Sequence, residues 1–331
     1  MKKILSLCLA AALVLSLAAC GKSEPESYPV EVVGPERTSA PVPTAAPDAS
    51  ASPQPGWAVA PRTDIEIQKS LADYDKPQTT QLAQQDQLAF FMQNDKIGVI
   101  DLEGNVRIPA DKDVHWCSVC GITNADESEV YEQDGTVVGA GGHGLASGTL
   151  YYDVNSRKVY AEDMGWLYSW EELKASTNQP FIADAVTITP KEGAGSPEDT
   201  YISATDTPVN VSEVQGKVII MPDGTPLDGV VYEEVTSASE GLFAAKMAGL
   251  WGFVNATTGQ QAVPFVYQSV RPFNEGLAAV KTADGWGFIN TSGAEQTVMT
   301  FENAQSASGG KAWVKTADGW GVALLSDWKP A

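Results

Sequence analysis

The chain has 331 residues, with 42 acidic against 21 basic side chains and a formal charge of −21 at pH 7. Phosphates and anionic headgroups repel so acidic a chain, which excludes nucleic acid as a partner and membrane contact through charge. Its 43% hydrophobic content allows a sizeable core in one or two domains, and its four cysteines exclude a disulfide-stapled scaffold.

The first 20 residues are organised like a bacterial export signal. Lys2 and Lys3 precede an apolar run over 4–17, which is shorter than the roughly 20 residues that a membrane-spanning helix needs. The run ends in Leu17-Ala18-Ala19-Cys20, and this order resembles a bacterial lipoprotein signal peptide with its lipobox. The resemblance implies that residues 1–19 are removed and that Cys20 carries diacylglycerol, with palmitate-type acyl chains. The alternative is an ordinary secretory signal with an incidental cysteine.

Residues 20–61 are expected to be the lipidated cysteine followed by a disordered linker. Nine of the 20 prolines lie in 21–61, interleaved with Ala, Ser and Glu. So little apolar content cannot compensate the entropy lost on ordering. The segment therefore predicts a tether that keeps the folded part close to the membrane.

An internal repeat occupies the C-terminal third. The heptapeptide Lys-Thr-Ala-Asp-Gly-Trp-Gly occurs at 281–287 and again at 315–321, and a looser copy stands at 246–252. The three copies are about 35 residues apart, a period typical of repeats whose single units cannot bury their own apolar face. Residues 277–282 and 286–290 read as strands joined by an Asp-Gly turn, and 263–270 reads as a third strand. The prediction is an all-β fold of tandem three-stranded repeats, arranged as an open solenoid or a propeller-like closed array.

These residues, together with Phe-Asn-Glu-Gly-Leu at 273–277, resemble the WG-repeat family over about 241–325. A weaker copy covers 209–240, where Gly216-Lys217 replaces Trp-Gly, and a degenerate one lies near 97–109. We therefore expect a degenerate β-repeat region with insertions over 62–208 and WG-type repeats over 209–331. The pattern is lost between about 115 and 208, where a hairpin at 150–160 and a short helix at 170–173 are expected. The resemblance implies a scaffold or binding surface and supplies no catalytic residues.

The repeated Trp-Gly pair allows two interpretations. The tryptophans could stack on wall glycans, or they could fill the core of each repeat. Since Ile97 and Gly216 take the Trp position in two copies, core packing is favoured, because an aliphatic side chain can replace a core ring but not a stacking platform. The glycines that follow are expected to permit a bulge or a close backbone approach, and they are Gly98, Gly252, Gly287 and Gly321.

The remaining candidates for chemistry are His115, Cys117, Cys120 and His143. Two Cys and two His could hold zinc, although their spacing is not that of a common finger. Trp116-Cys117-Ser118-Val119-Cys120 resembles the thioredoxin motif, but no convincing helix follows it. A local structural disulfide between Cys117 and Cys120, formed outside the cell membrane, is the favoured reading.

Together these features predict an envelope lipoprotein without enzymatic activity, cofactor or metal, anchored to the cell membrane through Cys20 and facing the periplasm or the extracellular space. Its repeats would bind another envelope macromolecule, and the negative charge favours a protein over a glycan. The alternatives are a redox or zinc protein acting through Cys117/Cys120 with His115/His143, and wall-glycan binding through the repeat tryptophans.

Overall fold

The computed structural model describes residues 56–73, 85–117, 121–124, 129–131, 137–139, 149–163, 166–170, 179–191, 201–203 and 208–330. The expected signal peptide and most of the expected tether lie outside these residues, as does nearly all of the short helix expected at 170–173. The described elements are β-strands and three-residue 3-10 helices, which confirms the all-β prediction. No helix among these residues is long and apolar enough to cross a membrane.

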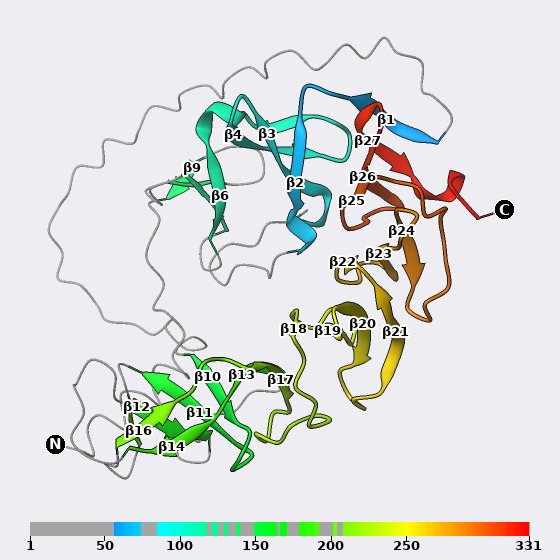
Figure 1. Cartoon of the computed structure of the whole chain (residues 1–331). Helices are drawn as coiled ribbons and strands as arrows, with labels where there is room; N and C mark the ends of the chain where they lie inside the picture. The colour runs from blue at the N-terminus through cyan, green and yellow to red at the C-terminus, as the bar shows by residue number, and fades with distance from the viewer. Residues whose placement is uncertain are drawn as a thin grey trace, which may run out of the picture. The chain divides into compact units, whose positions relative to one another are not determined.

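The described residues divide into two compact units, 149–226 and 56–139 with 227–330, each with the gaps given above. In its described residues the second unit, which contains the WG-type repeats, holds five antiparallel sheets (Figure 1). Two of them come from its N-terminal part. In spatial order, one consists of β2 (Glu66–Ser70), β3 (Leu88–Gln93), β4 (Lys96–Asp101) and β5 (Val106–Ile108). The other consists of β6 (Val114–Cys117), β7 (Gly121–Asn124), β8 (Val130–Tyr131) and β9 (Val137–Gly139).

The other three sheets contain the sequence repeats. One consists of β18 (Glu234–Val235), β19 (Leu242–Met247), β20 (Leu250–Asn255) and β21 (Gln261–Tyr267), and the next of β22 (Ser269–Val270), β23 (Leu277–Lys281) and β24 (Trp286–Asn290). The last, the closing sheet, consists of β25 (Asn303–Ala304), β26 (Lys311–Thr316), β27 (Gly319–Leu324) and β1 (Trp57–Arg62). In the described part of this unit, 3-10 helices lie at Leu71–Asp73, Gln85–Gln87, Ala110–Lys112 and Leu325–Asp327.

Each predicted hairpin forms, but the second turn differs from the expected Asp-Gly turn, because Thr316 pairs with Gly319 and leaves Ala317 and Asp318 as the turn residues. Lys281 lies opposite Trp286, and Lys315 opposite Trp320. The stretch expected as one strand over 263–270 instead belongs to two sheets, because the chain leaves β21 at Tyr267 and enters β22 at Ser269. Each sequence repeat is therefore shared between neighbouring sheets.

Neighbouring sheets of this unit pack face to face through shared apolar clusters. Phe253 and Tyr267 pack with residues of the β22–β24 sheet, and Phe288 packs with Val314 of the closing sheet. The closing sheet in turn packs on the β2–β5 sheet, which packs on the β6–β9 sheet. Small sheets of three or four strands stacked in this way are propeller-like rather than solenoid-like.

The first described strand completes the last repeat. Strand β1 pairs antiparallel with β27, with Trp57 opposite Ala323 and Arg62 opposite Trp320 (Figure 1). The backbone N–H of Leu324 donates to the carbonyl of Gly56 at 2.9 Å. This pairing covers the edge that β27 would otherwise expose, and exposed edges invite pairing with other chains. Residues 57–61, which composition places at the end of the Pro-rich linker, thus form most of β1.

Glu-Gly turns join consecutive repeats at the opposite end of the hairpins from the Asp-Gly turns. Glu240-Gly241 and Glu275-Gly276 both have positive φ, as tight two-residue hairpin turns require. The Glu275 carboxylate accepts the backbone N–H of Gly309 at 2.7 Å, and that of Glu240 accepts the N–H of Gly276 at 2.9 Å. Each acidic side chain therefore ties its own turn to the next.

The other unit, in its described part, is one mixed eight-stranded sheet. The hairpin expected at 150–160 is present, with Tyr152 opposite Val159 in a core that also holds Ala183 and Val218. Gly216 and Lys217, which replace Trp-Gly in the weaker sequence copy, are the first two residues of β17 (Gly216–Ile220). In spatial order the strands are β14 (Ile188–Pro190), β16 (Pro208–Val211), β15 (Tyr201–Ser203), β12 (Trp166–Ser169), β11 (Lys158–Asp163), β10 (Leu150–Asp153), β13 (Phe181–Val186) and β17 (Gly216–Ile220).

Candidate functional site

The repeat tryptophans are structural. Trp286 and Trp320 are 6% and 1% exposed, and each belongs to an apolar cluster that joins two sheets. Trp251 is half-buried against the cluster that contains Phe253. The core interpretation is thus confirmed for Trp286 and Trp320, whose faces are not available to stack on a sugar.

The glycine after each tryptophan allows the outer strand to approach closely. A methyl group built on any of the four predicted glycines would lie within 2.7 or 2.8 Å of a backbone atom of the adjoining segment, at Ala110, Val263, Val298 and Val59 respectively. Real Cβ atoms do not approach backbone so closely, and the strand pairing is irregular next to Gly98, Gly252 and Gly321. The prediction of a bulge or close approach is confirmed.

Each of the three repeat tryptophans has a cation beside its ring, and over Trp286 it is the guanidinium of Arg271, 5.4 Å from the ring centroid. The Nζ atoms of Lys246 and Lys315 lie 5.9 Å from the ring centroids of Trp251 and Trp320. A carboxylate holds each lysine, Glu234 on the neighbouring strand at 2.7 Å in one case and Glu66 in the other. The Lys-x₄-Trp spacing therefore gives a cross-strand cation–π pair in the first and last of these repeats, whereas in the middle repeat Arg271, and not Lys281, lies over the ring.

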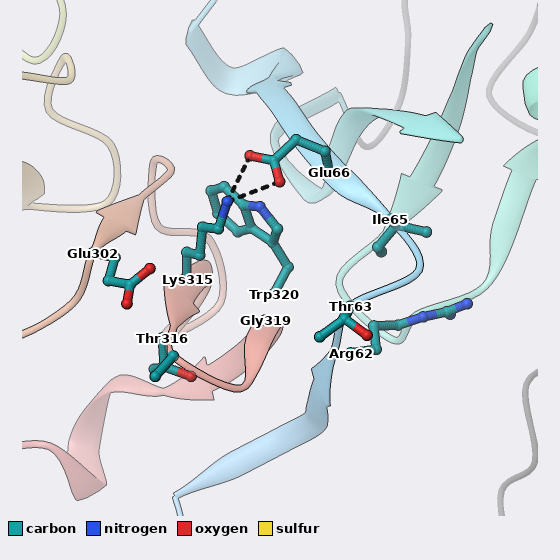
Figure 2. Close-up of a pocket in the computed structure, with 10 residues that line it drawn as sticks. Arg62, Thr63, Ile65, Glu66, Glu302, Lys315, Thr316, Gly319 and Trp320 are labelled. Carbon is teal, nitrogen blue, oxygen red and sulfur yellow. Dashed lines mark hydrogen bonds and ion pairs between the residues drawn. The ribbon is translucent and has the colours of Figure 1, made fainter. Parts of the chain in front are cut away.

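The Lys315 pair lies in a cavity of about 430 Å³ between the β1–β2 connection and the end of the β26–β27 hairpin. Figure 2 shows the Lys315 amino group beside Trp320, with its two hydrogen bonds to the Glu66 carboxylate, at 3.1 and 2.9 Å. Arg62 at the cavity wall is hydrogen-bonded to Asp64 and holds the pKa of that carboxyl below its usual range. Its charged, largely paired walls suit polar contacts with a ligand or partner.

A buried polar cluster joins three sheets and was not expected from the sequence. The Asp73 side chain is 2% exposed, accepts a hydrogen bond from Ser306 Oγ, and lies 3.8 Å from Arg271 Nε. Burial raises the pKa of Asp73, and Arg271 and Ser306 oppose that rise. The backbone N–H of Ser70 donates to Gln305 Oε1 at 3.1 Å. Because these residues come from segments about 200 residues apart, no local pattern could have identified the cluster.

Of the sequence-predicted site residues, the structure describes His115 and Cys117. Both lie on β6, and His115 Nε2 is 3.2 Å from Oγ1 of the buried Thr123. Cys20, Cys120 and His143 lie outside the described residues, so lipidation, the disulfide and the zinc set stay predictions. Among the residues that the structure describes, no three His, Cys, Asp or Glu side chains are grouped as metal ligands.

Comparison with solved structures finds similarity to the extracellular domain of a protein described as a one-component system from B. thetaiotaomicron. The sequences are 11% identical, the TM-score is 0.35, and the match covers 85% of this chain but only 44% of that one. The CNH domain of AfRom2 matches at 9% identity and a TM-score of 0.23, over 79% of this chain and 80% of that domain. A search of curated proteins returns no match.

Comparison with protein families identifies one family, described as the WG containing repeat, at residues 251–285 and 286–320. The two matched copies begin at Trp251 and Trp286, and they span the β20–β27 region whose Trp-Gly hairpins are described above. Residues 251–320 of this chain therefore contain two consecutive WG repeats.

Proposed function

We propose that the protein is an envelope lipoprotein whose repeat sheets are a non-catalytic module for binding another envelope macromolecule, a protein in preference to a glycan. The observation that carries the proposal is that the repeats share the same strand pairing but differ at their hairpin ends, which read Ala248-Gly249-Leu250 in one and Ala-Asp-Gly in the other two. Rigid scaffolds that vary their loop ends are a common design for recognition.

Cys20 is the proposed attachment point. Diacylglycerol supplies two chains, and two chains anchor a protein stably where a single one binds reversibly. Metabolic labelling with a radioactive fatty acid should mark the wild-type protein and not Cys20→Ser. Equal labelling of both, or of neither, would reject the anchor while leaving the binding module open.

Two other functions compete with a protein-binding module. Burial of Trp286 and Trp320 removes the ring faces that wall-glycan binding would require. A redox or zinc function would use Cys117 and Cys120, with His115 and His143. One observation favours it: His115 and Cys117 are two residues apart on β6 and therefore project from the same face.

Co-purification from solubilised envelopes tests the proposal against the redox alternative. The bait is the full-length protein, because a bait that starts at residue 62 would lack nearly all of β1. The wild type and a Cys117→Ser/Cys120→Ser variant are compared by quantitative mass spectrometry. We expect the same few envelope proteins on both baits. Mixed disulfides found on the wild type alone, or no retained protein, would contradict a cysteine-independent binding module.

A further inference from the structure

The β19–β20 hairpin ends in a group of exposed apolar side chains. Four of the six large hydrophobic side chains that are exposed in the described part of the chain fall between 231 and 266. They are Val231, Met247, Leu250 and Val266, with exposed fractions of 41%, 42%, 37% and 56%. We call these four residues the apolar tip.

Backbone pairing brings the four residues together. Met247 lies directly opposite Leu250 across the turn, so their side chains share a face. Trp251, next to Leu250, pairs with Tyr267, which places Val266 beside the same end of β20. The Glu233 carboxylate accepts the N–H of Gly249 at 3.0 Å, which holds the segment containing Val231 at the turn.

The fold itself does not require an apolar surface here. At the position of Met247 the two sister hairpins carry Thr282 and Thr316, and at that of Leu250 they carry glycine. Phe301, opposite Trp286, corresponds to Tyr267, so the exposed Thr300 corresponds to Val266. The threonine positions are thus polar in repeats with the same strand pairing. The glycines have a conformational reason, because Gly285 and Gly319 have positive φ and an added Cβ would meet the backbone of the adjoining segment. Clustered apolar exposure marks interaction sites.

Charge around the apolar tip indicates the kind of occupant. Lys246 is neutralised by Glu234 at 2.7 Å, while Glu233 has no ion pair among the described residues. The rim is therefore negative, and the whole chain carries −21. A second copy of so acidic a chain, or an anionic membrane, would be repelled. A surface that pairs apolar side chains with Lys or Arg would match both features.

We propose that the apolar tip is a docking site for an envelope protein segment in which apolar side chains are flanked by basic residues. This inference rests on the proposed binding function and names the surface and the chemistry of its partner. Docking covers the apolar side chains and places a cation against Glu233. Removing one large apolar side chain from such a contact weakens binding about tenfold or more.

Photocrosslinking in the living cell tests the site with the full-length protein. A benzophenone amino acid replaces Met247, and in a matched control it replaces Thr282, the equivalent position of the middle repeat. We expect Met247 adducts on one envelope protein, within a peptide that carries apolar residues next to Lys or Arg. Adding Leu250→Ser should lower their yield about tenfold, and the Thr282 probe should not form them.

The remaining outcomes separate the site from the proposed function. Adducts of Met247 with residues 148–226 of the same chain, or with a second copy at twice the mass, would overturn the site. So would adducts on an acidic partner peptide or a yield unaffected by Leu250→Ser. If probes at Thr300 or Val214 capture an envelope protein and Met247 does not, the binding module stands and the apolar tip is rejected. If no probe captures one, the proposed function fails.

Discussion

At the scale of single residues, the Trp-Gly pair has one task on each side of the strand. The tryptophan fills the cluster between two sheets, and the glycine leaves room for the backbone of the outer strand. The same division holds at Gly98, where Ile97 replaces tryptophan, so the glycine position is retained in a copy in which the ring is not.

Gly98→Ala is predicted to lower the free energy of unfolding by about 1–3 kcal/mol, because its methyl group would press on the backbone at Ala110. The matched control is Gly249→Asn, at a turn with φ +78° and nothing within 4 Å of an added Cβ. Asn tolerates that conformation, so a loss below about 1 kcal/mol is expected. Urea denaturation measures both, and equal losses would refute the close-approach role.

Asp73 predicts a pH dependence of stability. Its pKa is raised by burial above the ordinary 3.8, so the folded state keeps a proton that the unfolded chain has already lost. Its contribution to stability therefore becomes less favourable as pH rises from about 4 through the raised pKa. Asp73→Asn removes this titration while its amide oxygen can still accept the Ser306 hydrogen bond.

The variant's free energy of unfolding, relative to wild type, should accordingly increase between pH 4 and pH 7. Arg271→Gln removes the cation that opposes the rise in the Asp73 pKa. The free energy of unfolding of this variant should therefore fall more between pH 4 and pH 7 than that of the wild type. Urea titrations at several pH values provide the measurement. A difference between Asp73→Asn and wild type that stays constant or shrinks with pH would contradict the raised pKa.

At the scale of elements, the closing strand β1 is held mainly by one residue. Trp57 is 9% exposed, packs in the cluster between two sheets, and meets Trp328 edge-on at a centroid distance of 5.2 Å. The Trp328 indole N–H also donates to the carbonyl of Gly56 at 2.9 Å. These contacts tie the start of β1 to the segment that follows β27.

Trp57→Ala is predicted to destabilise the protein by about 3–5 kcal/mol and to speed hydrogen exchange of residues 319–324, which lose their outer neighbour. Trp57→Phe keeps most of the apolar contact and should cause a much smaller change. Hydrogen exchange in β23 should change least when Trp57 is replaced. Unchanged protection of 319–324 in Trp57→Ala would show that β1 does not close the last repeat.

The sequence allowed prediction of the hairpins but not of the sheets. Asp-Gly turns and alternating apolar residues are local signals, so the strands 277–281 and 286–290 could be placed within a residue. The division between β21 and β22, the pairing of β1 with β27, and the Asp73–Ser306 contact depend on segments that meet only after folding. The apolar tip could not be predicted from the sequence either, because the identity of Met247 and Leu250 does not show that their side chains are exposed.

At the scale of the whole molecule, the proposed function requires a repeat module that presents its hairpin ends to a partner close to a membrane. The stacked sheets are held by buried tryptophans, Glu-Gly ties and β1, so the hairpin ends can differ while the strand pairing stays the same. Binding by such a module should change the solvent exposure of the hairpin ends and leave the apolar clusters between the sheets unchanged.

The most direct test is hydrogen exchange of the full-length protein, compared between intact envelopes and the purified, detergent-solubilised state. We expect slower exchange in envelopes at the ends of the repeat hairpins, including 247–250, with unchanged exchange at the buried strand residues 278–280. Identical exchange of the repeat region in the two states would contradict the claim that these repeats bind another envelope macromolecule.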